Sequence, residues 1–399
     1  MSMTGFLRRQ RPRRLSAAGR TLLALMGALL SVLCAAGPIG CSRCTQREIA
    51  AARYAPAHSQ DWNVSTPAEQ GLDPALVGRL YCQAAKLDKL YGLLVVKNGH
   101  LVAEGYFNGG SVDQRALLQS ATKSYVSALV GIALAQGCLT SLDQRMIAFF
   151  PDLSDGITDP RKRQITLRQL LQMRSGYPWE ESDRALWERF LEGDWLPLIV
   201  ETPLVSDPGA EHHYSNLTSY ILAVIVARAC NTDLSAFAQR NLFSPLGTAE
   251  SNVWGYPGTP VKDKDGYTYP NLRATARSAA KLGQLYLDDG NYRGRQILSA
   301  DWVRDSLTAH TADAWISSTL GGFEEIAYGH QWWSGRAGNH RAWFAWGHGG
   351  QLVVLIEELD MVIVTTADPF FRQHDGESWQ HEEATIELVS EFIESLPSS

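Results

Sequence analysis

The sequence predicts an α+β fold in which one antiparallel sheet is built from both ends of the chain, flanked by helices and with a mainly helical subdomain inserted. Strand patterns occur at Leu93–Phe107 and return over 342–366, whereas the stretch of about 140–290 follows the periodicity of helices. Strands so far apart in the chain share one core when they pair in a single sheet. We therefore expect residues 61–399 to form one domain, with the helical subdomain at about 140–290.

The first 40 residues have the pattern of a targeting segment. They carry six arginines and no acidic residue, and Thr21–Ala36 is uncharged and rich in Leu and Ala before the turn at Gly37-Pro38. A basic stretch, an apolar stretch and a break are typical of a signal peptide, and an uncleaved membrane anchor has a similar composition. We expect an exported protein, periplasmic or membrane-anchored with its domain facing outward, and Cys41 leaves lipid anchoring as an alternative.

The chain after this leader is acidic. Without the six arginines, 30 basic and 42 acidic residues remain, a net charge of −12. Such a surface has no electrostatic attraction for nucleic acid or anionic lipid. We therefore expect a small-molecule substrate, no nucleic-acid partner, and contact with a membrane only through the N-terminal segment.

The cysteines do not predict a disulfide framework. Cys41 and Cys44 form a C-x-x-C, but it lies in the leader rather than at a strand-to-helix turn, so a redox or metal site is not favoured. Cys82, Cys138 and Cys230 are odd in number and far apart. We expect each of these three to be a small buried hydrophobic residue.

The elements follow in chain order. Residues 41–60 are expected to be a linker, and structure to begin near Asp61. The pattern at Leu93–Phe107 alternates around Asn98-Gly99, which is typical of a hairpin turn. A mostly apolar helix is predicted from about Ser120 to Gln136, where Gly137 can end it. Further helices are predicted at Leu167–Met173, Ser219–Ala229, Leu234–Asn241, Ala274–Asp288 and Ala384–Leu396, and strands at Ala342–Trp346, Gln351–Glu357 and Met361–Thr366.

The first candidate for chemistry is an S-x-x-K pattern formed by Ser120 and Lys123. A spacing of three residues places both side chains on one face of a helical turn. Lys123 is the only charged residue between Ala116 and Leu142, so burial is expected to lower its pKa and let it accept the Ser120 proton. The pattern alone is weak evidence, because a buried helix whose lysine reaches solvent has the same sequence.

A second S-x-x-K occurs at Ser278 and Lys281. It opens an amphipathic helical pattern with charged residues nearby. We expect its lysine to be solvated and the pair to be structural.

The second candidate is Tyr214-Ser215-Asn216, which follows a Pro-Gly turn and precedes an apolar helix. A tyrosine acts as a general base only if its pKa falls from about 10 towards 7, and a neighbouring lysine ammonium is the expected cause. The amide of Asn216 offers a donor and an acceptor, suited to hold the lysine and a substrate amide. Two other Y-x-N patterns, at Tyr106 and Tyr269, lie in a hairpin strand and a Tyr-Pro turn and are expected to be structural.

The third candidate is the run Gly-His-Gly-Gly-Gln at 347–351, at the entrance to a strand. The two glycines after His348 would let a substrate backbone approach the strand closely. A glycine-rich bend with an ordinary hydrogen-bonded histidine is the alternative. On this pattern we expect His348, Gly349 and Gln351 to bind substrate together with Asn216.

Taken in order, these motifs resemble the serine β-lactamase and penicillin-binding-protein superfamily, in its class C and esterase branch, and within it the 6-aminohexanoate-dimer hydrolase type. The resemblance extends from about Leu93 to Asp368. Besides the three motifs it rests on short segments at 165–171, 175–176, 208–209, 244–247, 298–303 and 359–360. It implies a β-lactamase/transpeptidase-like fold.

The resemblance also implies an acyl-enzyme mechanism. Ser120 would attack a carbonyl carbon, while Lys123 and Tyr214 would move the proton. By the family pattern, the backbone N–H groups of Ser120 and Gln351 would form the oxyanion hole.

The third motif departs from the family pattern, because many relatives have Lys-Thr-Gly where this chain has His348 and two glycines. A histidine supplies at most a partial positive charge at neutral pH, whereas a lysine favours a carboxylate substrate. We therefore expect a serine hydrolase of ester or amide bonds in small substrates. A β-lactamase or D-alanyl-D-alanine carboxypeptidase is the alternative.

No cofactor or metal is expected, because the ten histidines show no metal-ligand spacing and no H-E-x-x-H occurs. The absence of G-x-S-x-G argues against an α/β-hydrolase nucleophile. A non-catalytic ligand-binding protein of the same fold is a second alternative, disfavoured because all three motifs keep competent residues. Trp179, Trp187 and Trp195 either line an acyl pocket or pack the helical subdomain.

Overall fold

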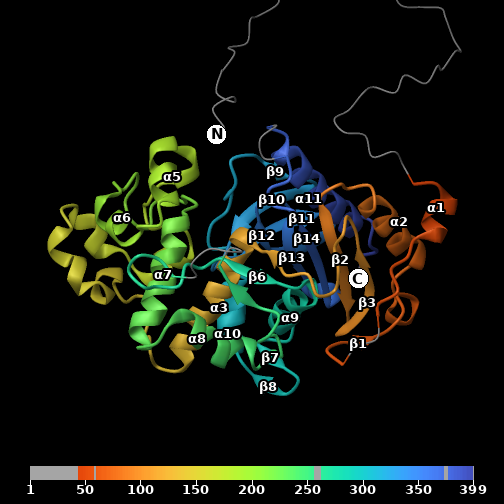
Figure 1. Cartoon of the computed structure of the whole chain (residues 1–399), viewed down its shortest axis with the longest axis horizontal. Helices are drawn as coiled ribbons and strands as arrows, with labels where there is room; N and C mark the ends of the chain where they lie inside the picture. The colour runs from red at the N-terminus through yellow and green to blue at the C-terminus, as the bar shows by residue number, and fades with distance from the viewer. Residues whose placement is uncertain (1–43, 58–59, 256–261, 373–375, 399) are drawn as a thin grey trace, which may run out of the picture. The chain divides into compact units, whose positions relative to one another are not determined.

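A nine-stranded sheet organises the molecule (Figure 1). The computed structural model describes residues 44–57, 60–255, 262–372 and 376–398, so the predicted N-terminal segment lies outside the described residues. The strand order is β1-β3-β2-β14-β13-β12-β11-β10-β9. The strands are β1 Asn63–Val64, β2 Leu90–Lys97, β3 His100–Tyr106, β9 Thr319–Leu320, β10 Phe323–Tyr328, β11 Trp333–Ala337, β12 His340–Gly347, β13 Gln351–Ile356 and β14 Met361–Ala367.

The two ends of the chain meet in this sheet, as predicted. Strand β2 pairs antiparallel with β14, with Leu93 opposite Thr365. The predicted hairpin joins β2 to β3 through Asn98 and Gly99, whose positive φ angles of 50° and 70° suit a tight turn. The edge strand β1 pairs parallel with β3, so the sheet is mixed rather than purely antiparallel. The predicted α+β fold class is confirmed.

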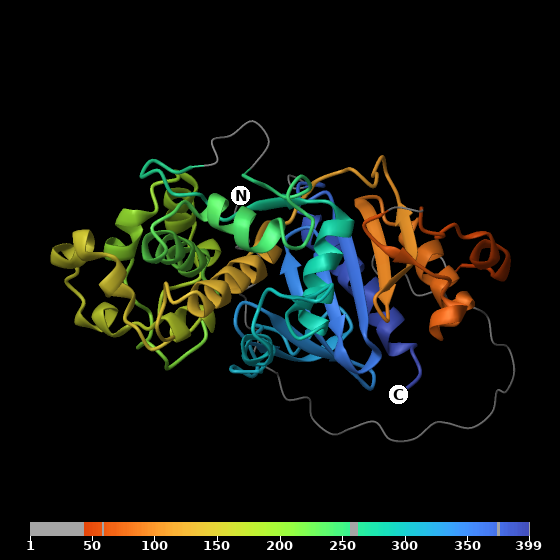
Figure 2. The same cartoon turned by 90° about the horizontal axis from the view of Figure 1, so that it is seen from below.

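Helices cover both faces of the sheet because its central strands are apolar on both sides. Leu93, Val95 and Ile363 face one hydrophobic cluster, which includes residues of α2 and α11. The alternate residues, such as Leu94 and Val364, face the other cluster, which includes residues of α3 and α9. These helices are α2 Pro74–Ala84, α3 Thr122–Ala135, α9 Ala276–Leu287 and α11 Ser378–Glu394, and Figure 2 shows the layers from below.

The helical subdomain lies between the first and last strands in sequence, as predicted, and Figure 1 shows it beside the sheet. Its longest helix, α7, is buried along nearly its whole length. A three-stranded sheet in the order β4-β6-β5 joins two strands that follow α7 in the chain, β5 and β6, to β4, which precedes α3. The elements of this region are α4 Leu167–Leu171, α5 Arg184–Leu191, α6 Leu196–Glu201, α7 Asn216–Ala229, α8 Leu234–Ala238, β4 Ala116–Leu117, β5 Val253–Trp254 and β6 Leu272–Ala274; β7 Asn291–Tyr292, β8 Arg295–Gln296 and α10 Ala300–Ser306 come after it.

The structure corrects two expectations about the cysteines and the linker. The predicted linker contains the helix α1 Gln46–Ala51, which Cys44 ties to α2 through a disulfide with Cys82. A second disulfide joins Cys138 to Cys230, at the ends of α3 and α7. The paired cysteines are 38 and 92 residues apart in the sequence. The sequence alone could not identify these two disulfides, because a separation along the chain says nothing about spatial proximity.

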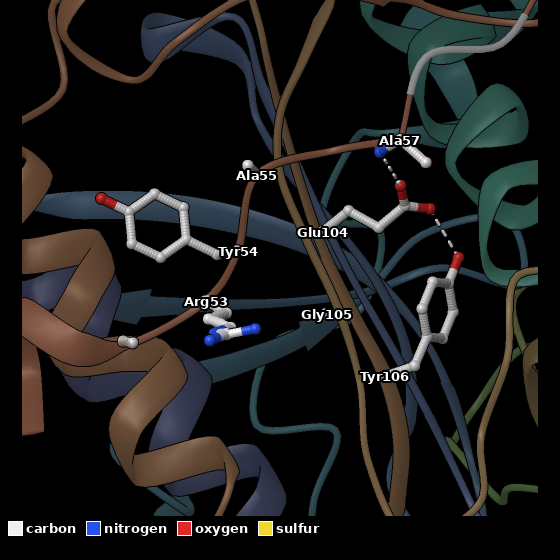
Figure 3. Close-up of a pocket in the computed structure, with 8 residues that line it drawn as sticks. Arg53, Tyr54, Ala55, Ala57, Glu104, Gly105 and Tyr106 are labelled. Carbon is white, nitrogen blue, oxygen red and sulfur yellow. Dashed lines mark hydrogen bonds between the residues drawn. The ribbon is translucent and has the colours of Figure 1, made fainter.

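The segment after α1 packs on β3 and forms a hollow with it, lined by Tyr54, Glu104 and Tyr106 among others (Figure 3). The buried Glu104 carboxylate accepts hydrogen bonds from Arg277 at 2.6 and 2.7 Å and from Tyr106 at 2.6 Å. Its acceptor sites are therefore occupied by the protein itself. None of the residues that line this hollow belongs to the three motifs.

Within the described ranges, no single helix has the length and apolarity to span a membrane. Helix α7 and the helical segment Leu234–Phe243 pass that test only as a pair bent by 78°.

Candidate active site

The structure brings Ser120, Lys123, Tyr214 and Asn216 together. Ser120 lies in a 3₁₀ turn, Gln119–Ala121, that leads directly into α3. Lys123 is in the first turn of α3 and only 8% exposed. Its Nζ donates to Ser120 Oγ at 2.9 Å and to Asn216 Oδ1 at 2.8 Å. The lysine thus connects the candidate nucleophile, in the turn before α3, with the start of α7.

Burial of Lys123 increases the fraction of its neutral form. Burial lowers its pKa to about 8, while the carboxylates of Glu181 and Glu180 act in the opposite direction. At pH 7 about a tenth of the lysine is therefore neutral and able to accept a proton. The expectation that its apolar helix lowers the pKa agrees with this environment.

Tyr214 lies against Lys123, with its ring centroid 4.9 Å from Nζ. Its pKa is raised, mainly by burial, although a hydrogen bond with Ser120 lowers it. Glu181 and Glu180 add to the increase. This differs from our expectation that the lysine would bring the tyrosine pKa towards 7, because burial raises the pKa by more than the hydrogen bond with Ser120 lowers it. The geometry therefore supports a protonated tyrosine that relays a proton rather than a tyrosinate base.

Glu180 fixes the start of α7, and the sequence analysis missed it. Its buried carboxylate accepts from Ser215 Oγ at 2.6 Å and from the N–H groups of Asn216 and Leu217 at 2.8 and 3.0 Å. A carboxylate that accepts from these first N–H groups stabilises the helix N-terminus. The neighbouring Glu181 accepts from Asn216 Nδ2 at 2.9 Å, which orients the amide oxygen toward Lys123.

The third motif reaches this site through Gly347 at the end of β12. A Cβ added to Gly347 would lie 2.0 Å from the carbonyl oxygen of Leu118 and 3.0 Å from the N of Ala121. The strand backbone therefore contacts the turn that carries Ser120, and only glycine fits there. The backbone N–H next to this contact belongs to His348.

The side chains of the third motif differ from our expectation. The Gln351 amide is fully buried and bonds to the backbone of Ala367, donating at 2.9 Å and accepting at 3.0 Å. The N–H of Gly349 donates to Glu382 Oε2 at 2.8 Å. Both glycines after His348 contact the protein itself, since added Cβ atoms would lie 2.5 Å from Pro369 and 2.9 Å from Thr385. They leave no approach for a substrate backbone at these two positions.

His348 is paired with a buried carboxylate that the sequence analysis did not identify. Its side chain is 44% exposed, and its Nδ1 lies 2.8 Å from Oε2 of Glu382, which is 1% exposed. Burial lowers the pKa of His348, but the hydrogen bond and charge of Glu382 outweigh it, so the pKa is raised overall. The imidazole is therefore more positive than expected from sequence, although Glu382 supplies a matching negative charge.

Aromatic rings surround the catalytic candidates. The Tyr214 ring stacks on Trp333 at 5.4 Å, and Trp333 contacts Trp346, next to Gly347, at 5.5 Å. Of the three tryptophans singled out from the sequence, Trp195 and Trp187 pack the helical subdomain, on Tyr269 and Phe190. The third, Trp179, contacts Trp315 and so belongs to an aromatic cluster at the site. The members of this cluster are Tyr214, Trp179, Trp315, Trp333, Trp346 and Trp379.

The second S-x-x-K lies elsewhere, in α9, but not on a solvated face as expected. Ser278 and Lys281 are both buried, at 4% exposure each. Ser278 accepts from Thr275, the N-cap of the helix, and Lys281 donates to the carbonyl oxygen of Gly247 at 3.3 Å. Both contacts are structural.

The comparison with known proteins agrees with this geometry. The sequence profile of the Beta-lactamase family matches residues 88–384. The chain belongs to this family. A 6-aminohexanoate-dimer hydrolase of Paenarthrobacter ureafaciens is 27% identical over 337 residues, which cover 78% of this chain and 82% of that protein. A monacolin J acid methylbutanoyltransferase of Aspergillus terreus is 30% identical over 200 residues, 45% of this chain and 46% of that protein.

A solved penicillin binding protein from Bacillus halodurans shows the same fold, with a TM-score of 0.56 at 18% identity over 75% of this chain and 97% of that one. The predicted resemblance and the predicted fold are both confirmed by these matches.

Proposed function

We propose that this member of the beta-lactamase family is a serine hydrolase that cleaves ester or amide bonds of small substrates through an acyl-enzyme on Ser120. One observation carries the proposal: the buried Lys123 Nζ contacts both Ser120 Oγ, at 2.9 Å, and Asn216 Oδ1, at 2.8 Å. A nucleophile within reach of a base that a third group orients is the arrangement that nucleophilic catalysis requires.

The proton path follows from the two pKa directions. Neutral Lys123 takes the proton of Ser120 as Oγ attacks the substrate carbonyl carbon. Tyr214 keeps its own proton at neutral pH and lies against the lysine, so it passes a proton to the leaving oxygen or nitrogen and recovers one from Lys123. Water then attacks the acyl-enzyme by the reverse path and restores the Ser120 hydroxyl.

The oxyanion hole uses the backbone N–H of Ser120 and, in our proposal, the N–H of His348 rather than that of Gln351. The close approach of Gly347 to Leu118 and Ala121 supports this choice, because it places the residue after Gly347 beside the nucleophile. Gln351 instead pairs with Gly347 in the β12–β13 ladder. Two backbone donors held by a rigid strand and a helix start stabilise a developing negative charge without rearrangement.

The part of the site that we expect to face the substrate is apolar and carries little net charge. The tryptophan cluster offers flat apolar surface beside Tyr214. The His348–Glu382 pair is electrically balanced when both groups are charged, so the site lacks the uncompensated cation that a substrate carboxylate favours. These features support an uncharged ester or amide rather than a β-lactam.

The relative from Paenarthrobacter ureafaciens is named as a hydrolase of an amide dimer, which supports hydrolysis of amide bonds here. Export is part of the proposal, and the two disulfides support it, because disulfides persist mainly in oxidising compartments.

The deciding experiment combines covalent labelling with a substrate panel. A fluorophosphonate should modify the wild type at Ser120, located by peptide mass spectrometry, and Ser120→Ala should lose the label. The panel contains short-chain p-nitrophenyl esters, linear amides, nitrocefin and a D-Ala-D-Ala peptide, and we expect turnover of esters or amides. Labelling without turnover of any compound would favour the non-catalytic alternative, and nitrocefin as the best substrate would favour a β-lactamase.

A further inference from the structure

A cluster of three metal-type side chains lies outside the catalytic site. Asp305 is on α10, His310 is in the loop that follows, and His330 lies between β10 and β11. One ligand atom from each lies within 4.8 Å of the others. His310 Nε2 is 3.1 Å from Asp305 Oδ1, and His330 Nδ1 is 3.7 Å from Asp305 Oδ2. The two imidazole rings stack with centroids 4.5 Å apart.

His330 has a buried ring nitrogen without a hydrogen-bond partner among the described residues. Its side chain is 0% exposed, and its Nδ1, which points toward Asp305, has no hydrogen-bond partner among the described residues. A buried polar atom without a partner is costly and rare in native proteins. The other ring nitrogen lies 3.3 Å from the Gln172 amide. If the Gln172 amide is turned so that its oxygen faces His330, the oxygen accepts a hydrogen bond from Nε2–H of His330. Nδ1 of His330 then carries no proton, and its lone pair is directed into the cluster.

We propose that Asp305, His310 and His330 bind a divalent transition-metal ion, with zinc as the best match. Two imidazoles and a carboxylate are ligands that zinc prefers. His310 Nε2 lies 3.1 Å from Oδ1 of Asp305 and His330 Nδ1 lies 3.7 Å from Oδ2, so the carboxylate has an oxygen beside each imidazole. Asp305 and His310 are partly exposed, which leaves a path for entry and room for a solvent ligand in the fourth position.

An ion would require His310, which is partly exposed, to turn out of its near-parallel stack on His330, because an imidazole binds a metal in the plane of its ring. His310 Nε2 also lies 2.8 Å from the Asp305 carbonyl oxygen, a contact that metal binding would replace. Arg168 Nη1 lies 4.0 Å from Asp305 Oδ2, but its closer partner is Asp143, at 3.1 Å. The Asp305 carboxylate therefore keeps an oxygen for the ion.

The position of the cluster predicts a structural rather than a catalytic ion. The residue after His330 is Gln331, which holds the two helices of the catalytic site. Its carbonyl oxygen accepts from Ser124 on α3 at 2.7 Å, and its side-chain oxygen accepts from Ser219 on α7 at 2.7 Å. An ion that fixes His330 to α10 would therefore hold this connection in place without touching substrate.

The test is a titration of the chelator-treated full chain with Zn²⁺ alone, followed by calorimetry, and with Co²⁺, followed by its visible absorption. We expect a Zn²⁺ site whose affinity falls at least tenfold in His310→Gln and in Asp305→Asn, with loss of the tetrahedral Co²⁺ bands. The melting temperature of the wild type should rise with Zn²⁺, and that of the two variants should not.

The matched control is His340→Gln. His340 is also buried beside a carboxylate, but both of its ring nitrogens have partners, Glu358 and the carbonyl oxygen of Leu396. This variant should keep the Zn²⁺ affinity of the wild type. Circular dichroism confirms that each variant is folded, and because His310 and Asp305 are partly exposed, their substitution is tolerated more easily than that of His330. Equal Zn²⁺ affinity in wild type and His310→Gln, or a wild type that binds no Zn²⁺, would overturn the proposal.

Discussion

In the proposed mechanism Lys123 accepts the Ser120 proton only in its neutral form, and the neighbours of the lysine set how much of that form is present. Because its pKa is lowered to about 8, kcat/KM is expected to rise about tenfold per pH unit below about pH 8 and to level off above it. Glu181 favours the charged form of the lysine. Replacing it with glutamine should therefore lower the lysine pKa and move the rise to lower pH.

The size of this pKa shift follows from the distance between the Lys123 and Glu181 charges, which the Asn216 amide bridges. Lys123 Nζ lies 2.8 Å from Asn216 Oδ1, and Asn216 Nδ2 lies 2.9 Å from Glu181 Oε1. Through this amide the charges are about 8 Å apart, worth about 0.5 kcal/mol at the dielectric of water and about 2 kcal/mol at an effective dielectric of about 20. Glu181 is exposed, so solvent screening favours the lower part of this range. We expect the midpoint to fall by about half a unit to one unit in Glu181→Gln.

The assay is the pH dependence of kcat/KM for a neutral ester, measured for the wild type and Glu181→Gln under identical salt. Glu188→Gln is the matched control, because Glu188 is an exposed glutamate paired with Arg184 at 2.8 Å on α5. A misplaced Asn216 would lower the plateau without moving the midpoint, so the two effects are separable. A midpoint in Glu181→Gln that stays in place or rises would refute the role assigned to Lys123.

The remaining predictions concern other parts of the chain. Ser278→Ala should keep turnover within a few-fold, whereas Ser120→Ala should lose at least about a thousandfold, and comparable losses in steady-state assays would refute the distinction. His348→Lys should raise activity toward carboxylate-bearing substrates relative to neutral esters by less than about tenfold, because Glu382 would balance a lysine as it balances His348; a wild type that hydrolyses nitrocefin as efficiently as its best ester would contradict this. Replacing both Cys138 and Cys230 by serine should lower the free energy of unfolding by about 2–5 kcal/mol in urea titrations. N-terminal sequencing of the native protein should find residues 1–30 removed or membrane-bound, and intact cytosolic protein would contradict export.

Local patterns in the sequence predicted much of the fold, because the sheet depends on strongly apolar strands. The hairpin around Asn98 and the strands β12, β13 and β14 were all identified from alternation and turn residues. The motif order predicted that Ser120, Lys123 and Tyr214 act together, and the structure places their side chains in contact. These features can be predicted from a single sequence because each depends on a few neighbouring residues.

Partners far apart in the chain could not be identified in this way. Glu180 and Glu382 resemble ordinary surface carboxylates in the sequence, yet both are buried and organise the site through backbone N–H groups. The disulfide of Cys138 with Cys230 depends on where two helices end in space. The strands β10 and β11 were also missed, because their aromatic and polar residues do not alternate cleanly.

The site is assembled from both layers of the fold, and this explains why its glycine is indispensable to the geometry. The turn before α3 supplies the serine, α3 supplies the lysine and α7 supplies Asn216, while β12 brings its backbone against that turn. The turn and the strand meet at Gly347 without an intervening side chain, so in the proposed oxyanion hole the N–H groups of Ser120 and His348 would come from these two elements. A helix start alone offers one such donor, and a strand end alone offers another. Their contact would pair the two donors beside Ser120 and the buried Lys123, an arrangement that neither element provides by itself.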